Sequence, residues 1–257
     1  MNKLMVRLMA LALLVSFTGS AYAQAKNGSR KVLFVGNSYT YVQNLPQLVS
    51  IMSDSTDVKL ITRKSVVGGA FLTEHWNEKR GLKSPELIRK GHFDAVVIQG
   101  NSMETINQPD TTRKYARLLC DLARKSGAKP YLYMTWAREK VPQYQGQISK
   151  IYTEIAKEND AVLVPVGEAW ALAKELRPTI ELYSSDGSHP SNLGALLSAT
   201  IFVGALTGEV PARLPEWYQI KDMDGETVEL TNMDSLDAVF FQKVASQILG
   251  EYGLLKK

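Results

Sequence analysis

The sequence predicts an α/β protein in which about five parallel strands form one sheet covered on both faces by helices. Short apolar runs alternate with amphipathic segments of helical period along most of the chain, and strands separated by such helices pair in parallel. The composition, 45% hydrophobic and 22% charged, is that of a globular protein and excludes disorder, collagen-like repeats and a coiled coil. Because no internal repeat or low-complexity linker interrupts the pattern, we expect a single domain over residues 24–257.

The N-terminal segment, residues 1–23, has the pattern of a secretory signal peptide. Lys3 and Arg7 precede an apolar run over 8–17, and small residues then end in Ala21-Tyr22-Ala23, an A-x-A cleavage site. The apolar run is shorter than the roughly 20 residues of a membrane span. We therefore expect an exported protein, periplasmic or secreted, with no stable membrane insertion after cleavage.

The charge balance gives no sign of a nucleic-acid partner. The formal net charge is +4, and removing Lys3 and Arg7 leaves 28 basic against 26 acidic residues. The basic residues over 79–90 are interrupted by Glu86, so they predict a solvated helix face rather than a binding surface.

Cys120 is the only cysteine of the chain. It lies among leucines at helical spacing, which is typical of a buried and unreactive thiol. A chain with one cysteine forms no internal disulfide, so we expect its stability to come from a packed core.

Five apolar runs, each followed by glycine or polar residues, predict the strands of the sheet. Continuous runs of this kind are expected where a strand is buried on both faces. They cover residues 31–35, 58–67, 93–98, 130–136 and 161–166.

Segments of helical period predict the helices between these strands. Near the end of the chain, Ser191 has the position of an N-cap for a helix, and Asp224-Gly225 between alternating segments indicates a hairpin over 218–230. The expected helices include residues 45–52, 72–90, 115–126, 148–155, 192–201 and 236–244.

The chemistry is expected at the carboxyl ends of the strands, where ligands bind in open parallel sheets. Gly36-Asn37-Ser38 follows the first strand, Gly68-Gly69 the second, and Gln99-Gly100-Asn101-Ser102 the third. A serine on a sharp strand-to-helix turn can expose its hydroxyl as a nucleophile, although Gly-Asn-Ser is also ordinary turn chemistry. Neither a phosphate-binding loop nor a dinucleotide fingerprint is present.

Of the three histidines, His189 is the best candidate for a general base. Asp186 precedes it by three residues in a glycine-containing loop, and such a carboxylate holds an imidazole in the tautomer that accepts a proton. His75 lies on an expected helix and His92 at the opposite edge of the sheet. No histidine has another within five residues, so we expect no metal site.

Taken in chain order, Gly36-Asn37-Ser38, Gly69, Asn101 and Asp186-x-x-His189 resemble the motifs of the SGNH hydrolases, the GDSL esterase and lipase superfamily. The resemblance extends over most of the chain after the signal segment. It implies a flavodoxin-like, three-layer α/β/α fold and a serine esterase without a cofactor.

The resemblance also implies residue roles. Ser38 would be the nucleophile, His189 the general base and Asp186 its orienting carboxylate. The oxyanion hole would consist of the Ser38 and Gly69 backbone N–H groups and the Asn101 side chain, three donors aimed at the developing negative charge.

Two positions depart from the motifs of the family. Asn37 replaces the usual Asp beside the nucleophile, and Gln99 replaces the Gly of the usual Gly-x-Asn-Asp block. If the register of that block slips, Gln99 rather than Asn101 would supply the oxyanion amide, and a similar slip would put Gly68 in the place of Gly69.

The expected substrate is a small-molecule or glycan ester, and removal of acetyl groups from a carbohydrate is the favoured reaction. His75-Trp76-Asn77-Glu78 resembles a segment of bacterial SGNH proteins from carbohydrate-degrading organisms, and Trp136 could stack on a sugar ring or be a core aromatic. Asn37, Gln99 and Trp136 are the expected substrate contacts. Two alternatives stay open: a non-catalytic glycan-binding protein with this fold, and an acyltransferase that uses the same triad.

Overall fold

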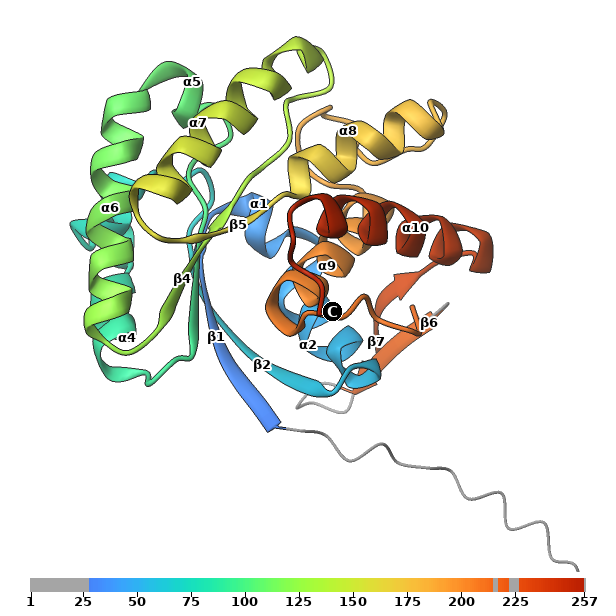
Figure 1. Ribbon diagram of the computed structural model, residues 1–257, viewed down its shortest axis with the longest axis horizontal. Helices are drawn as coiled ribbons and strands as arrows, with labels where there is room; N and C mark the ends of the chain where they lie inside the picture. The colour runs from blue at the N-terminus through green and yellow to red at the C-terminus, as the bar shows by residue number, and fades with distance from the viewer. Residues whose placement is uncertain (1–27, 215–216, 222–226, 257) are drawn as a thin grey trace, which may run out of the picture.

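The computed structural model describes residues 28–214, 217–221 and 227–256 (Figure 1). The expected signal peptide, residues 1–23, lies outside the described residues, as does the Asp224-Gly225 turn. No helix in the described ranges combines the length and the apolar character needed to cross a membrane.

The central sheet has five strands, all parallel, in the order β2-β1-β3-β4-β5, which confirms the predicted fold class. The chain order reverses between β1 and β3, so the crevice for a ligand is expected at the carboxyl ends of these two strands. There Gly36 pairs with Val66 and Val35 with Ile98, which brings the three following loops to one edge. The strands are β1 (Gly28–Gly36), β2 (Val58–Val66), β3 (Ala95–Ile98), β4 (Lys129–Tyr133) and β5 (Val162–Val164).

Helices cover both faces of the sheet and make the predicted three layers (Figure 1). Successive residues of β1 point to opposite faces, and accordingly Phe34 lies in one hydrophobic cluster while Leu33 and Val35 lie in the other. One face carries α2 (Leu45–Met52), α8 (Val166–Leu176), α9 (Asn192–Thr207) and α10 (Ser235–Glu251). The other carries α3 (Leu72–Trp76), α4 (Ser84–Lys90), α6 (Pro109–Lys125) and α7 (Gln145–Glu158).

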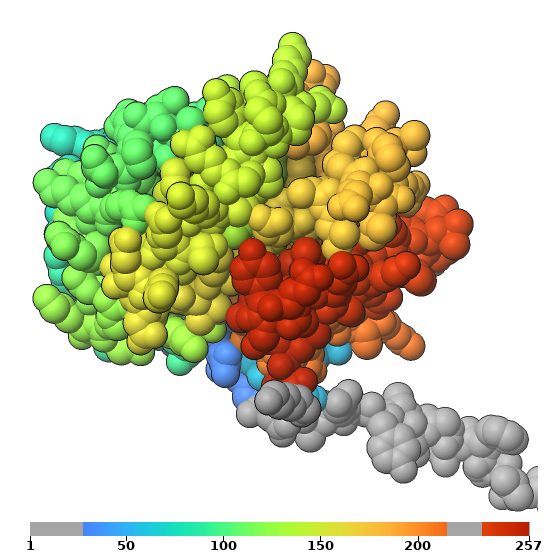
Figure 2. Space-filling model, turned by 45° about the horizontal axis from the view of Figure 1, so that its top comes forward, coloured from blue at the N-terminus to red at the C-terminus, as the bar shows by residue number. Residues whose placement is uncertain are grey.

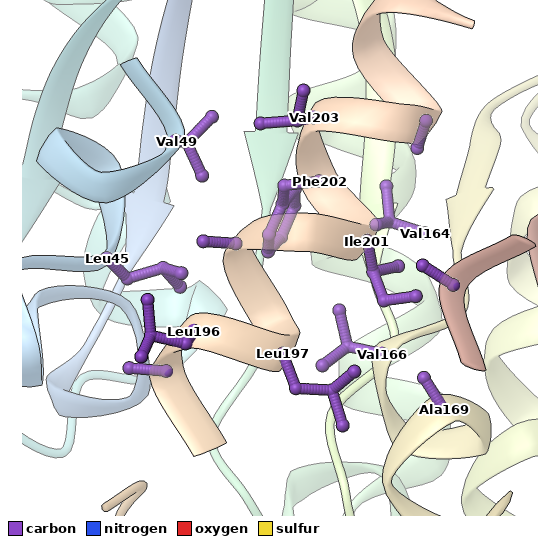
Figure 3. Packing of buried hydrophobic residues seen from close by; sticks show 14 of the residues in the cluster. Leu45, Val49, Val164, Val166, Ala169, Leu196, Leu197, Ile201, Phe202 and Val203 are labelled. Atoms are coloured by element: carbon purple, nitrogen blue, oxygen red, sulfur yellow. The ribbon is translucent and has the colours of Figure 1, made fainter. Parts of the chain in front are cut away.

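Helix α9 is the centre of the first face. Every residue from Gly194 to Thr207 is buried, because α2, α8 and α10 surround the side of α9 that does not contact the sheet. Phe202 and Ile201 project from it into the apolar cluster (Figure 3). Figure 2 shows α10, in red, on the outside of this layer, beside the yellow and orange segment that includes α8. The predicted Ser191 N-cap is confirmed, since its side chain accepts from the Gly194 N–H at 3.1 Å.

Two helix predictions need correction, and the hairpin prediction is confirmed. The helix expected over 72–90 is wrong: α3 and α4 are separated by a turn in which Glu78 and Arg80 have φ of +52° and +55°. Helix α8 was not predicted, because its sequence follows the β5 run with only Pro165 between them. The strands β6 (Trp217–Lys221) and β7 (Thr227–Asn232) pair antiparallel as expected.

Candidate active site

The candidate nucleophile lies where β1 turns into the short helix α1 (Ser38–Tyr41). Asn37 is the N-cap of this helix, and its side-chain oxygen accepts from the Tyr39 N–H at 3.1 Å. Ser38 is the first helical residue, so its backbone N–H has no carbonyl partner within the helix. The sequence therefore folds locally into a turn that presents the partly exposed Ser38 hydroxyl beside its own N–H, which has no hydrogen-bond partner among the described residues.

The structure brings Ser38, His189 and Asp186 into one hydrogen-bonded chain, although Ser38 and His189 are 151 residues apart. His189 Nε2 lies 2.8 Å from Ser38 Oγ, and His189 Nδ1 lies 2.5 Å from Asp186 Oδ2. The hydrogen bond from His189 lowers the pKa of Asp186 to about 2, with help from the Ser188 and His189 N–H groups. An ionised carboxylate only accepts, so Nδ1 donates and the neutral ring is left with Nε2 to accept the Ser38 proton.

The loop that carries His189 and Asp186 is fixed by short-range hydrogen bonds. Asp186 Oδ1 accepts from the Ser188 and His189 N–H groups, both at 2.9 Å. Gly187 has φ of +66°, a conformation that favours glycine, and Ser191 then caps α9 immediately downstream. The side chains of Asp186 and His189 remain 49% and 35% exposed, so the base is open to solvent and to a substrate.

A stack of three buried aromatic rings contacts this loop at Ser188. Trp136 lies between Tyr39 and Trp170, with ring centroids 4.7 and 3.8 Å away and nearly parallel planes. Its indole N–H donates to the Ser188 carbonyl at 2.9 Å, and the Tyr39 hydroxyl lies 2.7 Å from Ser188 Oγ. The expected stacking of Trp136 on a sugar is therefore wrong, because the ring is 1% exposed and both of its faces are covered.

A pair of buried amides holds the nucleophile side of the site together. Gln99 Oε1 accepts from the Asn37 N–H and from the Thr40 hydroxyl, both at 2.9 Å. Gln99 Nε2 donates to Asn37 Oδ1 and to the Gly100 carbonyl. Asn37 Nδ2 in turn donates to the carbonyls of Ala70 and Gly100, at 3.0 and 3.3 Å. The two side chains thus join the loops after β1, β2 and β3.

This pairing corrects two further expectations. Asn37 and Gln99 are 2% and 0% exposed and use all of their donors and acceptors inside the protein, so neither contacts substrate. The same saturation excludes Gln99 as the oxyanion amide. Gly36 belongs to this arrangement, because a Cβ there would lie 2.5 Å from Gln99 Oε1.

The remaining oxyanion candidates lie together at the edge of the sheet. Gly69, with φ of +68°, has an exposed backbone, and no hydrogen bond uses its N–H within the described residues. Asn101 Nδ2 donates one of its two amide hydrogens to the Gly69 carbonyl at 3.0 Å, and no acceptor for the other lies within the described ranges.

Glu104 is a supporting residue that sequence reasoning missed. It is fully buried, and its Oε2 accepts from the Asn101 N–H at 2.8 Å and from the Leu72 N–H at 3.4 Å. Burial raises the pKa of this carboxyl. The Asn-x-x-Glu spacing, which is that of a capping box, was the available signal for its role.

His75 is buried and is not part of the chain to Ser38. Its ring lies 3.0 Å from the Gly36 carbonyl through Nε2 and 2.7 Å from Ser84 Oγ through Nδ1. Burial lowers the pKa of His75 from 6.5 to about 4, so the ring is neutral at neutral pH. Since the Gly36 carbonyl can only accept, Nε2 donates to it and Nδ1 accepts from Ser84. His75 ties α3 to the end of β1 and leaves His189 as the base.

The fold is similar to those of solved SGNH hydrolase structures. A candidate SGNH hydrolase from Slackia heliotrinireducens superposes with a TM-score of 0.59 at 24% identity, covering 69% of this chain and 99% of that one. A DUF4886 family protein from Bacteroides uniformis gives a TM-score of 0.70 at 17% identity, covering 89% and 97%. An acetylxylan esterase from Geobacillus stearothermophilus gives 0.50 at 17% identity, covering 69% and 94%.

These similarities define the class of fold. No protein-family model and no curated protein matches the sequence. The chain has the fold of the SGNH hydrolases, and the resemblance predicted from its motifs is confirmed at the level of the fold.

Proposed function

We propose that this protein is a serine esterase that hydrolyses carboxylic esters through an acyl-serine intermediate. One observation carries the proposal: Asp186, His189 and Ser38 form a continuous hydrogen-bonded chain at the carboxyl edge of the sheet. A nucleophile bonded to a base that is oriented by a third group is the signature of an activated serine. The site also lies at the reversal of strand order, where ligands bind in this class of sheet.

The geometry accounts for each proton transfer. Ser38 Oγ attacks the ester carbonyl carbon while His189 Nε2 takes the hydroxyl proton, and Asp186 stabilises the imidazolium that forms. The carbonyl oxygen becomes negative beside the Ser38 N–H, the Gly69 N–H and the Asn101 amide. Cleavage of the C–O bond releases the alcohol with the proton from His189. Water, deprotonated by the same ring, then attacks the acyl-serine and frees the carboxylic acid and Ser38.

The finer proposal is an exported esterase that removes acetyl groups from a carbohydrate. It is supported by the signal-peptide pattern of residues 1–23 and by the similarity of the fold to an acetylxylan esterase. The partly exposed Ser38 and the exposed Asp186 also suit a bulky polar alcohol better than a buried fatty chain.

Hydrolysis of short aryl esters tests the function directly. Wild-type protein is expected to release 4-nitrophenol from the acetate faster than from the butyrate or octanoate, and Ser38→Ala is expected to lose at least about 10³-fold in kcat. Ser185→Ala is the matched control, because Ser185 is an exposed serine of the same loop region that has no part in the chain. Equal rates for the wild type and Ser38→Ala would contradict the proposal.

A further inference from the structure

Arg138 lies between the loop that carries Asn101 and the loop that carries Asp186 and His189. Its Nη2 donates to Ser102 Oγ at 3.1 Å, and Ser102 directly follows the oxyanion candidate Asn101. The N–H of the next residue, Glu139, donates to the Gly187 carbonyl at 2.9 Å, within the loop of the base. The Arg138 side chain therefore extends from the segment after β4, which contacts the loop of His189, to the loop that carries Asn101.

Arg138 differs from several arginines of the described part of the chain in having no ion-pair partner there. Arg138 is exposed, and among the described residues no carboxylate lies within ion-pair distance of it. Arg80, near the loop after β2, differs, because its Nη1 lies 3.6 Å from Glu74. The side chain of Glu139 instead lines a separate hollow of about 340 Å³, together with Lys174. A guanidinium held at one end by a neutral hydroxyl thus keeps free N–H donors at the rim of the site.

We propose that Arg138 binds a carboxylate of the substrate, so that the enzyme prefers anionic esters such as acetylated uronic acids. The proposal rests on the proposed esterase function and adds the charge of its substrate. A planar guanidinium can donate two parallel hydrogen bonds to a carboxylate, which gives orientation as well as affinity. The carboxylate belongs either to the acyl chain or to the alcohol, and separate substrates distinguish these positions.

Matched neutral and anionic esters test the preference. The acyl pair is 4-nitrophenyl acetate and mono-4-nitrophenyl glutarate, and the alcohol pair is acetylated methyl glucoside and acetylated methyl glucuronoside. Only the pair whose carboxylate reaches Arg138 should respond. For that pair, kcat/KM for the anionic ester divided by kcat/KM for the neutral ester is expected to be about 10-fold or more lower in Arg138→Ala than in the wild type. Arg138→Lys should restore part of it, and added salt should reduce it in the wild type. Lys140→Ala, a nearby exposed cation, should leave the ratio unchanged.

The outcomes separate this inference from the proposed function. If ester hydrolysis depends on Ser38 but the preference for anionic esters does not depend on Arg138, the inference is overturned and the proposed esterase function stands. If the wild type hydrolyses no ester, the proposed function fails, and binding then decides the role of Arg138. In Ser38→Ala protein, tighter binding of glucuronate than of glucose, lost on Arg138→Ala, supports the inference, and equal binding of the two sugars overturns it.

Discussion

Ser38 and His189 meet at one hydrogen bond, but the segments that carry them are held in different ways. Ser38 follows a turn anchored by the buried amides of Asn37 and Gln99, whose partners come from three loops. The His189 side chain lies in a partly exposed loop, and among the described residues the one protein group besides Ser38 that bonds its ring is Asp186, three residues away. Changes to the buried amides beside Ser38 should therefore act mainly on stability, whereas changes to Asp186 should act mainly on catalysis.

The largest expected effect is a loss of kcat on substitution of Asp186 in the loop of His189. Asp186→Asn retains an oxygen for the Ser188 and His189 N–H groups but loses the charge that fixes the tautomer of His189. We expect kcat to fall by about 10⁴-fold, while the free energy of unfolding changes by less than about 1 kcal/mol. Steady-state kinetics and urea denaturation measure the two, with Glu181→Gln as an exposed control. A large loss of stability would show that Asp186 is needed for folding as well as for catalysis.

Asn101→Ala is expected to be next in size. Loss of one oxyanion donor should lower kcat by about 10²–10³-fold with little change in KM. The Asn101 side chain donates to the Gly69 carbonyl and accepts from the Met103 N–H at 3.3 Å, so the expected cost in unfolding free energy is about 1–2 kcal/mol. An unchanged kcat would remove Asn101 from the oxyanion hole.

Gln99→Ala should give the opposite profile, with stability as its primary effect. The substitution removes Gln99 Oε1, the acceptor of the Asn37 N–H and the Thr40 hydroxyl, and it leaves a cavity beside the loop of the nucleophile. We expect the free energy of unfolding to fall by about 2–4 kcal/mol. Urea denaturation of Gln99→Ala and Asn101→Ala side by side checks this. A smaller loss for Gln99→Ala than for Asn101→Ala would contradict the assigned roles.

The effect that is smallest at neutral pH concerns the buried His75, because it develops only in acid. The unfolded chain binds a proton to this ring below pH 6.5, whereas the folded protein does so only near its pKa of about 4. Stability should thus be unaffected above pH 7 and fall by about 1.4 kcal/mol per pH unit between 6.5 and 4. His75→Gln should flatten that slope in denaturation curves measured from pH 7 to pH 5. If the stability of the wild type and that of His75→Gln fell equally with pH, the slope would not come from His75.

The sequence was informative where local pattern decides structure. Strands such as β1 were predicted because an apolar run such as 32–35 is buried on both faces, whereas β2, at the edge of the sheet, is largely exposed or half-buried. The Ser191 cap followed from residue type alone. The split of residues 72–90 was missed because Glu78 and Arg80 adopt positive φ, which these residue types rarely do.

The site was harder to predict wherever a side chain acts through distant partners. The Ser38, Asp186 and His189 positions stand in motifs with a recognisable order. The function of Gln99 depends on Asn37 and Thr40, about 60 residues away, so no local pattern reveals it. Trp136 looked like a ligand platform because its stacking partner Trp170 lies in a helix that the pattern did not predict.

The separation of 151 residues between Ser38 and His189 has a consequence for folding. Because His189 immediately precedes α9, the base reaches the nucleophile only when that buried helix has docked. Contacts of such long range form late, since the intervening chain must first be ordered. Recovery of esterase activity would therefore time the last stage of refolding, after helix and sheet signals have already returned.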